Sequence, residues 1–256
     1  MTTRDTPWPE GTPCWADLGA PDIAKAREFY SDVFSWTVQP GAPETGGYSA
    51  AELNGRGVAG VGPKMGSPEA PTMWLTYLAT SDANATAAKI TGAGGQVVTA
   101  PMDIMDIGRM AVAVDPAGAV FGVWEARAFP GAQIVNEPGA MCWNEQVSWD
   151  FEGSRAFYAA VFGYEYGDTS GGSSYATFKV DGRDVGGIGG LHAGVPADTP
   201  AAWRLYFGAA DTDALVTRVQ ANGGSVIREP IDHPYGRMST VADDQGALFS
   251  LLGVTP

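Results

Sequence analysis

The sequence predicts an α+β fold built as a tandem pair of similar domains, with four βαβββ modules in all. Three observations predict it. Residues repeat along the chain at a nearly constant spacing, aspartates follow short apolar runs where helices are expected to begin, and Asn-Gly or Asp-Gly pairs separate further apolar runs. Because the repeated residues extend over nearly all 256 positions, we expect both halves to share one fold.

The internal repeat has an offset of about 128 positions. Cys14-Trp15 returns as Cys142-Trp143, and Gly108-Arg109-Met110 returns as Gly236-Arg237-Met238. Other repeated pairs are Tyr48 and Tyr175, Trp74 and Trp203, Tyr77 and Tyr206, Asp82 and Asp211, and Asp115 and Asp243. The spacing predicts domains of residues 1–128 and 129–256, joined around residues 129–139, a stretch that contains prolines and glycines.

Each module is expected to begin with a strand and an Asp-capped helix. In the first module, a strand over residues 13–20 precedes Asp22, and a helix over residues 23–34 presents its apolar residues on one face. Asn54-Gly55 then predicts a tight hairpin, as Asp181-Gly182 does in the second half.

The pattern restarts at Trp74. A second strand leads to Asp82 as the next helix cap, and that helix is expected to stop at the glycines of residues 92–95. Two final strands are expected on either side of the turn Asp115-Pro116-Ala117-Gly118.

The composition indicates a compact globular protein and argues against some classes of partner. The chain is 45% hydrophobic, and its formal charge of -14 argues against nucleic acid or an anionic membrane as a partner. It has no membrane-length apolar stretch, and residues 1–11 lack the apolar core of a signal peptide, so a cytoplasmic location is expected. The expected oligomeric state is a monomer or a homodimer. Cys14 and Cys142 occupy equivalent positions and are interpreted as small buried residues, not as a disulfide framework.

The order of these elements resembles a known superfamily. The progression from Asp22 through Phe29-Tyr30 to Phe34-Ser35-Trp36, and the strand endings around Asp115, are similar to the vicinal-oxygen-chelate (glyoxalase, bleomycin-resistance and dioxygenase) superfamily over residues 11–254. The Cys-Trp and Gly-Arg-Met segments are most similar to actinobacterial two-domain proteins labelled glyoxalase-like antigens or hydroxylases. The resemblance implies that paired modules curl their sheets into a cup around a ligand or metal. It leaves the reaction open, because this fold hosts lyases, dioxygenases, isomerases and antibiotic-binding proteins.

The resemblance also implies where a metal would be held. Metal-dependent relatives place His or Gln on the first strand of a module and Glu on its last strand. The corresponding positions here are Trp15, Gly60, Trp74, Gly122, Trp143, Gly187, Trp203 and Ser250. None of these side chains offers the nitrogen or carboxylate ligand of a transition metal, and the only histidines are His192 and His233. We therefore expect no metal and no other cofactor, although a carboxylate-only site for Mg²⁺ or Ca²⁺ stays open.

Four tryptophans at or beside these positions are candidate ligand-binding residues: Trp15, Trp74, Trp143 and Trp203. An indole offers a large flat apolar surface and one N–H donor, which suits a planar ligand. The alternative is that these tryptophans fill the cup as core residues.

Two equivalent carboxylates and one histidine are the catalytic candidates. Asp17 and Glu145 lie two residues after Trp15 and Trp143, hence on the same strand face, where burial would suit a general acid or base. The alternative is that each caps backbone donors or pairs with an arginine such as Arg109 or Arg237. His233 is the third candidate, beside Tyr235 as a ligand-binding residue. The two lie in a loop that distinguishes the second half from the first and favours the second cup as the functional one.

Three functions are consistent with these observations. The first is metal-independent binding of a planar or polycyclic, natural-product-like molecule in an aromatic-lined cup. The second is a metal-independent enzyme of lyase, isomerase, cyclase or hydroxylase type that uses Asp17 or Glu145 as acid or base. The third is a metal-dependent lyase of the glyoxalase type.

Overall fold

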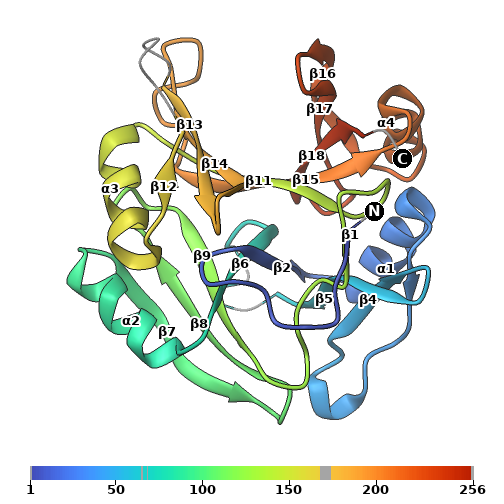
Figure 1. Ribbon diagram of the computed structural model, residues 1–256. Helices are drawn as coiled ribbons and strands as arrows, with labels where there is room; N and C mark the ends of the chain where they lie inside the picture. The colour runs from blue at the N-terminus through green and yellow to red at the C-terminus, as the bar shows by residue number, and fades with distance from the viewer. Residues whose placement is uncertain (1, 65, 68, 168–173, 255–256) are drawn as a thin grey trace.

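Two eight-stranded sheets and four α-helices make up most of the described part of the chain (Figure 1). The structure is a computed structural model and describes residues 2–64, 66–67, 69–167 and 174–254. Both halves have the same order of helices and strands, so the α+β prediction and the four βαβββ modules are confirmed. The two folds match because the repeated residues occupy strands, helix caps and turns alike.

The first sheet has the strand order β3-β4-β5-β2-β6-β9-β8-β7. Its central strands β2 and β6 run antiparallel, and each has a parallel neighbour, β5 or β9. The elements of this half are β2 (Pro13–Ala20), α1 (Ile23–Phe34), β3 (Thr37–Val38), the 3₁₀ helix η1 (Pro43–Thr45), β4 (Ser49–Leu53), β5 (Arg56–Pro63), β6 (Met73–Thr80), α2 (Ala83–Gly92), β7 (Gln96–Ile104), β8 (Gly108–Val114) and β9 (Val120–Ala126).

The second sheet repeats that order as β12-β13-β14-β11-β15-β18-β17-β16. Its elements are β11 (Met141–Ser148), α3 (Phe151–Phe162), β12 (Glu165–Tyr166), β13 (Tyr175–Val180), β14 (Arg183–Gly190), β15 (Ala202–Ala209), α4 (Thr212–Ala221), β16 (Ser225–His233), β17 (Gly236–Ala242) and β18 (Leu248–Gly253). A short pairing of β1 (Thr2–Thr3) with β10 (Ile134–Val135) ties the first residues to the segment between the halves.

Local sequence signals explain where the elements begin and turn. The Asp22 carboxylate accepts a hydrogen bond from the Lys25 backbone N–H, and Asp82 caps α2 in the same way. At the hairpin between β4 and β5, Asn54 and Gly55 have φ values of 54° and 73°. A two-residue hairpin turn of this kind needs positive φ at both positions, which Asn and Gly tolerate best.

The two halves pack back to back through the faces of the sheets that carry the helices. Helix α1 lies beside α4, and α2 lies beside α3 (Figure 1). The Tyr30 hydroxyl of α1 donates to Asp243 in the second half at 2.9 Å, and the Tyr158 hydroxyl of α3 donates to Asp115 in the first half at 3.0 Å. The opposite face of each sheet therefore points away from the other half, and we call it the outer face.

Two further expectations concern cysteines and the membrane. Cys14 and Cys142 are both free thiols, and Cys14 is fully buried. Of the helices that the structure describes, none combines the length and apolar character needed to cross a bilayer.

Candidate functional site

Strand alternation decides which side chains reach the outer face of the second sheet. The Gln146 side-chain amide donates to Asp115 of the first half at 3.0 Å and to Ser154 of α3 at 3.1 Å, so Gln146 points toward the helices. Successive side chains on a strand point to opposite faces. Trp143 and Glu145, on the same strand β11, therefore lie on the outer face.

Five side chains form a polar and aromatic group there, which we call the second-half cluster: Trp143, Glu145, Tyr175, Arg204 and Tyr206. The Tyr206 hydroxyl donates to Glu145 Oε1 at 2.8 Å, and Arg204 Nη1 lies 3.6 Å from the same oxygen. The Trp143 indole N–H donates to the Tyr175 hydroxyl at 2.9 Å. Burial, and then the charge of Glu145, raise the pKa of both tyrosines. Both phenols are therefore neutral hydrogen-bonding groups at pH 7.

An equivalent first-half cluster lies on the outer face of the first sheet. It consists of Trp15, Asp17, Tyr48 and Tyr77, with Leu75 at the position that Arg204 has in the second half. Asp17 Oδ1 accepts hydrogen bonds from the Trp15 indole at 2.7 Å and from the Tyr48 hydroxyl at 2.6 Å. Burial raises the pKa of Asp17, although the hydrogen bonds from tyrosine and tryptophan act in the opposite direction.

The chain itself covers the first-half cluster. The Phe129 ring packs edge-on against Trp15, with ring centroids 4.8 Å apart, and also contacts Trp124. The same segment is fixed where the Gly57 backbone N–H donates to the Gln133 side chain at 3.0 Å. As a result only 4% of Trp15 is exposed.

The second-half cluster has no such cover among the described residues. Trp143 is half-buried, and no ring contact to it occurs in the described part of the chain. The hairpins β13–β14 and β16–β17 rise on either side of the central strands β11 and β15 (Figure 1). The two equivalent tryptophans therefore differ in access.

Trp74 and Trp203 do not join the clusters, because their strand positions place them on the helix-facing side. The Trp74 indole donates to the Tyr30 hydroxyl at 3.0 Å, and the Trp203 indole donates to the Tyr158 hydroxyl at 2.8 Å. Both indoles lie in the core at least 93% buried, with 4% and 7% exposed.

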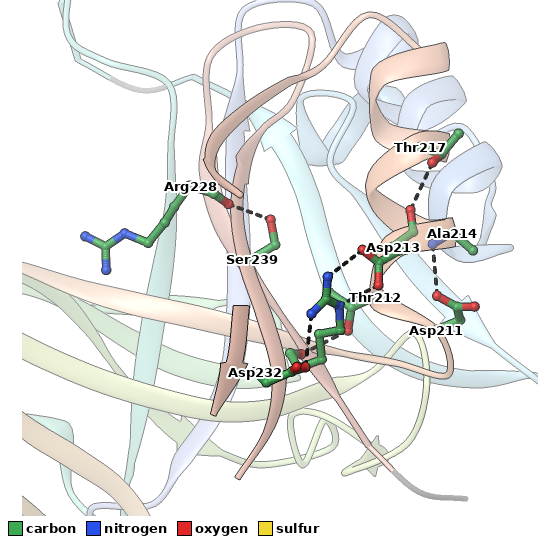
Figure 2. A network of polar contacts seen from close by, with 9 residues as sticks. Asp211, Thr212, Asp213, Ala214, Thr217, Arg228, Asp232 and Ser239 are labelled. Atoms are coloured by element: carbon green, nitrogen blue, oxygen red, sulfur yellow. Dashed lines mark hydrogen bonds and ion pairs between the residues drawn. The ribbon is translucent and has the colours of Figure 1, made fainter. Parts of the chain in front are cut away.

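His233 and Tyr235 lie near the tip of the β16–β17 hairpin. Their ring centroids are 5.3 Å apart, and 74% of Tyr235 is exposed. The hairpin is held to α4 because Arg237 of β17 pairs with Asp232 of β16 and with Asp213 of α4. Figure 2 shows Asp213 on the helix facing the strand that carries Asp232.

The arginines named as partners for the carboxylates have other partners. Arg237 pairs with Asp213 and Asp232, and Arg109 pairs with Asp103 at 2.9 Å. The cation next to Glu145 is Arg204, so the sequence-based pairing with Arg109 or Arg237 is corrected.

The strand register places one central carboxylate beside a mapped glycine in each half. Asp17 lies opposite Gly60, and Glu145 lies opposite Gly187. One carboxylate is fewer than the three or four ligands of a typical catalytic or structural centre. In the described ranges, no three His, Cys, Asp or Glu side chains come together to hold a metal ion.

Tyrosines occupy the space in which metal-ligating side chains would stand. A Cβ atom placed on Gly60 would lie 1.9 Å from the Tyr48 hydroxyl, and one on Gly122 would lie 2.2 Å from the Tyr77 ring. The residues present do not fit the metal centre that the fold supports elsewhere.

A cavity of about 350 Å³ lies at the junction of the halves, away from both clusters, where α1 ends and α4 begins. Its charged lining residues are already engaged. Asp211 caps α4 by accepting from the Ala214 N–H at 3.0 Å, and Arg218 donates to the Val33 carbonyl at 3.2 Å. The rest of the lining is mainly apolar, so the cavity offers little chemistry.

The cluster tyrosines and Arg204 were not among the site residues predicted from the sequence. The repeat did contain the pairs Tyr48 with Tyr175 and Tyr77 with Tyr206, and a pair kept in both halves on a strand could have marked them. Arg204 had a weaker signal, a charged residue between Trp203 and Leu205 in a mainly apolar strand.

Comparison with known proteins agrees with this architecture. The profile of the Glyoxalase/Bleomycin resistance protein/Dioxygenase superfamily matches residues 15–123 and 145–251, once in each half. The chain belongs to this superfamily.

Two similar proteins align with this chain over nearly their whole length. CFP32 of Mycobacterium tuberculosis, a protein provisionally named as a glyoxylase, is 39% identical over 254 residues, with 96% of each chain covered. The anthracycline biosynthesis protein DnrV of Streptomyces peucetius is 37% identical over 260 residues, covering 94% of this chain and 93% of DnrV.

Solved structures show the same superfamily fold at low sequence identity. The Mn(II)-bound glyoxalase from Novosphingobium aromaticivorans aligns with a TM-score of 0.66 at 15% identity, over 96% of this chain and 83% of that one. The 2,3-dioxygenase LapB from Pseudomonas sp. KL28 aligns with a TM-score of 0.64 at 11% identity, over 97% and 94%. At these identities the likeness concerns the fold alone.

Proposed function

We propose that the protein binds a planar aromatic small molecule on the outer face of the second sheet, with one ring of the ligand against Trp143. The observation that carries this proposal is the contrast between two equivalent tryptophans. The Phe129 ring packs edge-on against Trp15, whereas Trp143 bonds the equivalent tyrosine, Tyr175, and has no ring contact among the described residues. A ligand ring would take at Trp143 the place that Phe129 takes at Trp15.

The chemistry of the second-half cluster supports this class of ligand. An indole that is half-buried gains from stacking, because the ring removes further apolar surface from water. Tyr175, Tyr206 and Arg204 add hydrogen-bonding groups that suit the oxygen substituents of such a ring. His233 and Tyr235 are proposed as further contacts from the flanking β16–β17 hairpin.

The names of two relatives also support a polycyclic ligand. DnrV and the anthracycline biosynthesis protein DauV of Streptomyces sp. strain C5 are 37% and 36% identical to this chain. Anthracyclines are planar polycyclic aromatic compounds, and a flat ring system of this kind can stack on an indole.

A second proposed function is catalysis on that ligand without a metal. Its basis is that Glu145, the central carboxylate of the second-half cluster, lies 2.8 Å from the Tyr206 hydroxyl and 3.6 Å from Arg204. Glu145 would then act as the acid or base. Turnover of the bound molecule, lost in Glu145→Gln with binding retained, separates an enzyme from a sequestering protein.

Binding of anthraquinone-2-carboxylate to paired tryptophan variants tests the proposal. In isothermal titration calorimetry, Trp143→Ala should weaken binding by about 1–3 kcal/mol, the range measured when an aromatic stacking partner is removed. The matched control Trp15→Ala should leave the affinity unchanged while lowering the free energy of unfolding by about 3–5 kcal/mol, as core truncation does. The proposal fails if the wild-type protein does not bind the probe, or if Trp143→Ala binds it as tightly as wild type.

A further inference from the structure

We infer that Arg204 makes the second-half cluster selective for ligands with an anionic oxygen, a carboxylate or an ionised phenol, attached to the aromatic ring. This inference rests on the proposed function and names the ligand class of the same site. Arg204 would be the residue that determines specificity, and Trp143 the residue that provides the platform.

Arg204 lies at the right place for this role. The register pairs Glu145 with Arg204 and Trp143 with Tyr206, so Arg204 is the diagonal neighbour of Trp143 on the same face. Diagonal neighbours across an antiparallel pair are about 7–8 Å apart. A molecule with one ring on Trp143 can therefore extend a substituent to the guanidinium.

The guanidinium also has donors to offer. Arginine carries five N–H donors, and in the described part of the chain Arg204 has one close polar contact, the 3.6 Å approach to Glu145. That separation is longer than a hydrogen bond. Glu145 has a better partner in the Tyr206 hydroxyl at 2.8 Å, and the Arg204 side chain is 35% exposed.

The first half serves as an internal comparison. There the equivalent carboxylate, Asp17, is held by Trp15 and Tyr48, and Leu75 stands where the second half has Arg204. A central carboxylate on this face therefore does not require a cation beside it. The second half nevertheless has Arg204 beside Glu145. Because a partly exposed ion pair adds only about 0–1 kcal/mol, a gain in stability is a weak reason for the presence of Arg204.

Charge explains why an anionic ligand would need this residue. The chain carries a formal charge of -14, and Glu145 places one of its carboxylates at the centre of the face. An anion would be repelled there without a local cation. A guanidinium offsets that repulsion and can bind a carboxylate through two parallel hydrogen bonds.

Two probes of similar shape and different charge test the inference: anthraquinone-2-carboxylate and anthraquinone-2-carboxamide. Wild type should bind the carboxylate about tenfold or more tightly, since a hydrogen bond to a charged group contributes about 1.5–3 kcal/mol. Arg204→Leu, which installs the first-half residue, should lose the preference for the carboxylate, because the Glu145 charge would then repel that probe. Arg204→Lys should restore part of the preference. Arg183→Leu removes the same charge from an exposed position outside the cluster and should behave as wild type.

The outcomes distinguish the two levels of the proposal. If neither probe binds to wild type, the proposed function is overturned and this inference with it. If both probes bind through Trp143 with equal affinity, or if Arg204→Leu keeps the preference for the carboxylate, the inference alone is overturned.

Discussion

At the scale of single residues, two carboxylates of common origin have acquired different surroundings. Asp17 accepts hydrogen bonds from Tyr48 and from Trp15, which contacts the Phe129 ring. Glu145 accepts a hydrogen bond from Tyr206 and lies 3.6 Å from Arg204. The sequence identified both as equivalent inner-face acids. It did not reveal their different environments, because Phe129 and Arg204 reach the clusters from distant positions in the chain.

The pH dependence of stability reports the environment of Asp17. Burial raises its folded-state pKa above the ordinary value of 3.8, so the folded protein favours the protonated carboxyl. Its contribution to stability therefore decreases as the pH rises from 3.8 through the folded pKa. Asp17→Asn cannot ionise, and its free energy of unfolding relative to wild type should increase over that window. Urea unfolding at a series of pH values measures the difference.

Asp103→Asn provides a control of opposite sign. A hydrogen bond from Arg109 holds the pKa of Asp103 below its ordinary value of 3.8, so this variant should lose stability relative to wild type as the pH rises from the folded pKa to 3.8 and stay level above it. A parallel pH response of the two variants would show that Asp17 is not the buried carboxyl described here.

At the scale of elements, the sequence predicted local structure well and strand register poorly. The strand over residues 13–20, the helix over residues 23–34 and the Asn54-Gly55 turn all match, because caps and turns are decided by neighbouring residues. The face that Trp74 occupies was not predictable. It depends on the pairing of Leu18 with Trp74 across strands far apart in sequence, and a one-residue shift reverses every side chain.

The segment between the halves also has a structural role beyond that of a linker. Phe129 covers Trp15, so Phe129→Ala should lower the free energy of unfolding by about 3 kcal/mol, at the low end of the range for buried phenylalanines because this ring is half-buried. Tyr235→Ala, which truncates an aromatic residue that is 74% exposed, should change it by less than about 0.5 kcal/mol. If chemical denaturation showed equally small changes in the free energy of unfolding for both variants, Phe129 would not be a buried cover of Trp15.

At the scale of the whole molecule, the duplication is arranged so that the halves bind each other reciprocally. Trp36 of the first half donates to the Gly139 carbonyl, and the equivalent Tyr164 of the second half donates to the Gly11 carbonyl. Together with the Tyr30–Asp243 and Tyr158–Asp115 hydrogen bonds, these contacts hold the helix-facing sides together. Back-to-back packing leaves the two outer faces at opposite ends of the molecule, where they could diverge independently (Figure 1).

The central claim is that one outer face is closed by Phe129 and the other receives an aromatic ligand. A crystal structure of the protein with anthraquinone-2-carboxylate tests it most directly. The account predicts one probe molecule with a ring against Trp143 and its carboxylate hydrogen-bonded to Arg204, while Phe129 remains on Trp15. A probe bound between Trp15 and Phe129, or in the cavity between α1 and α4, with Trp143 bare, would contradict it.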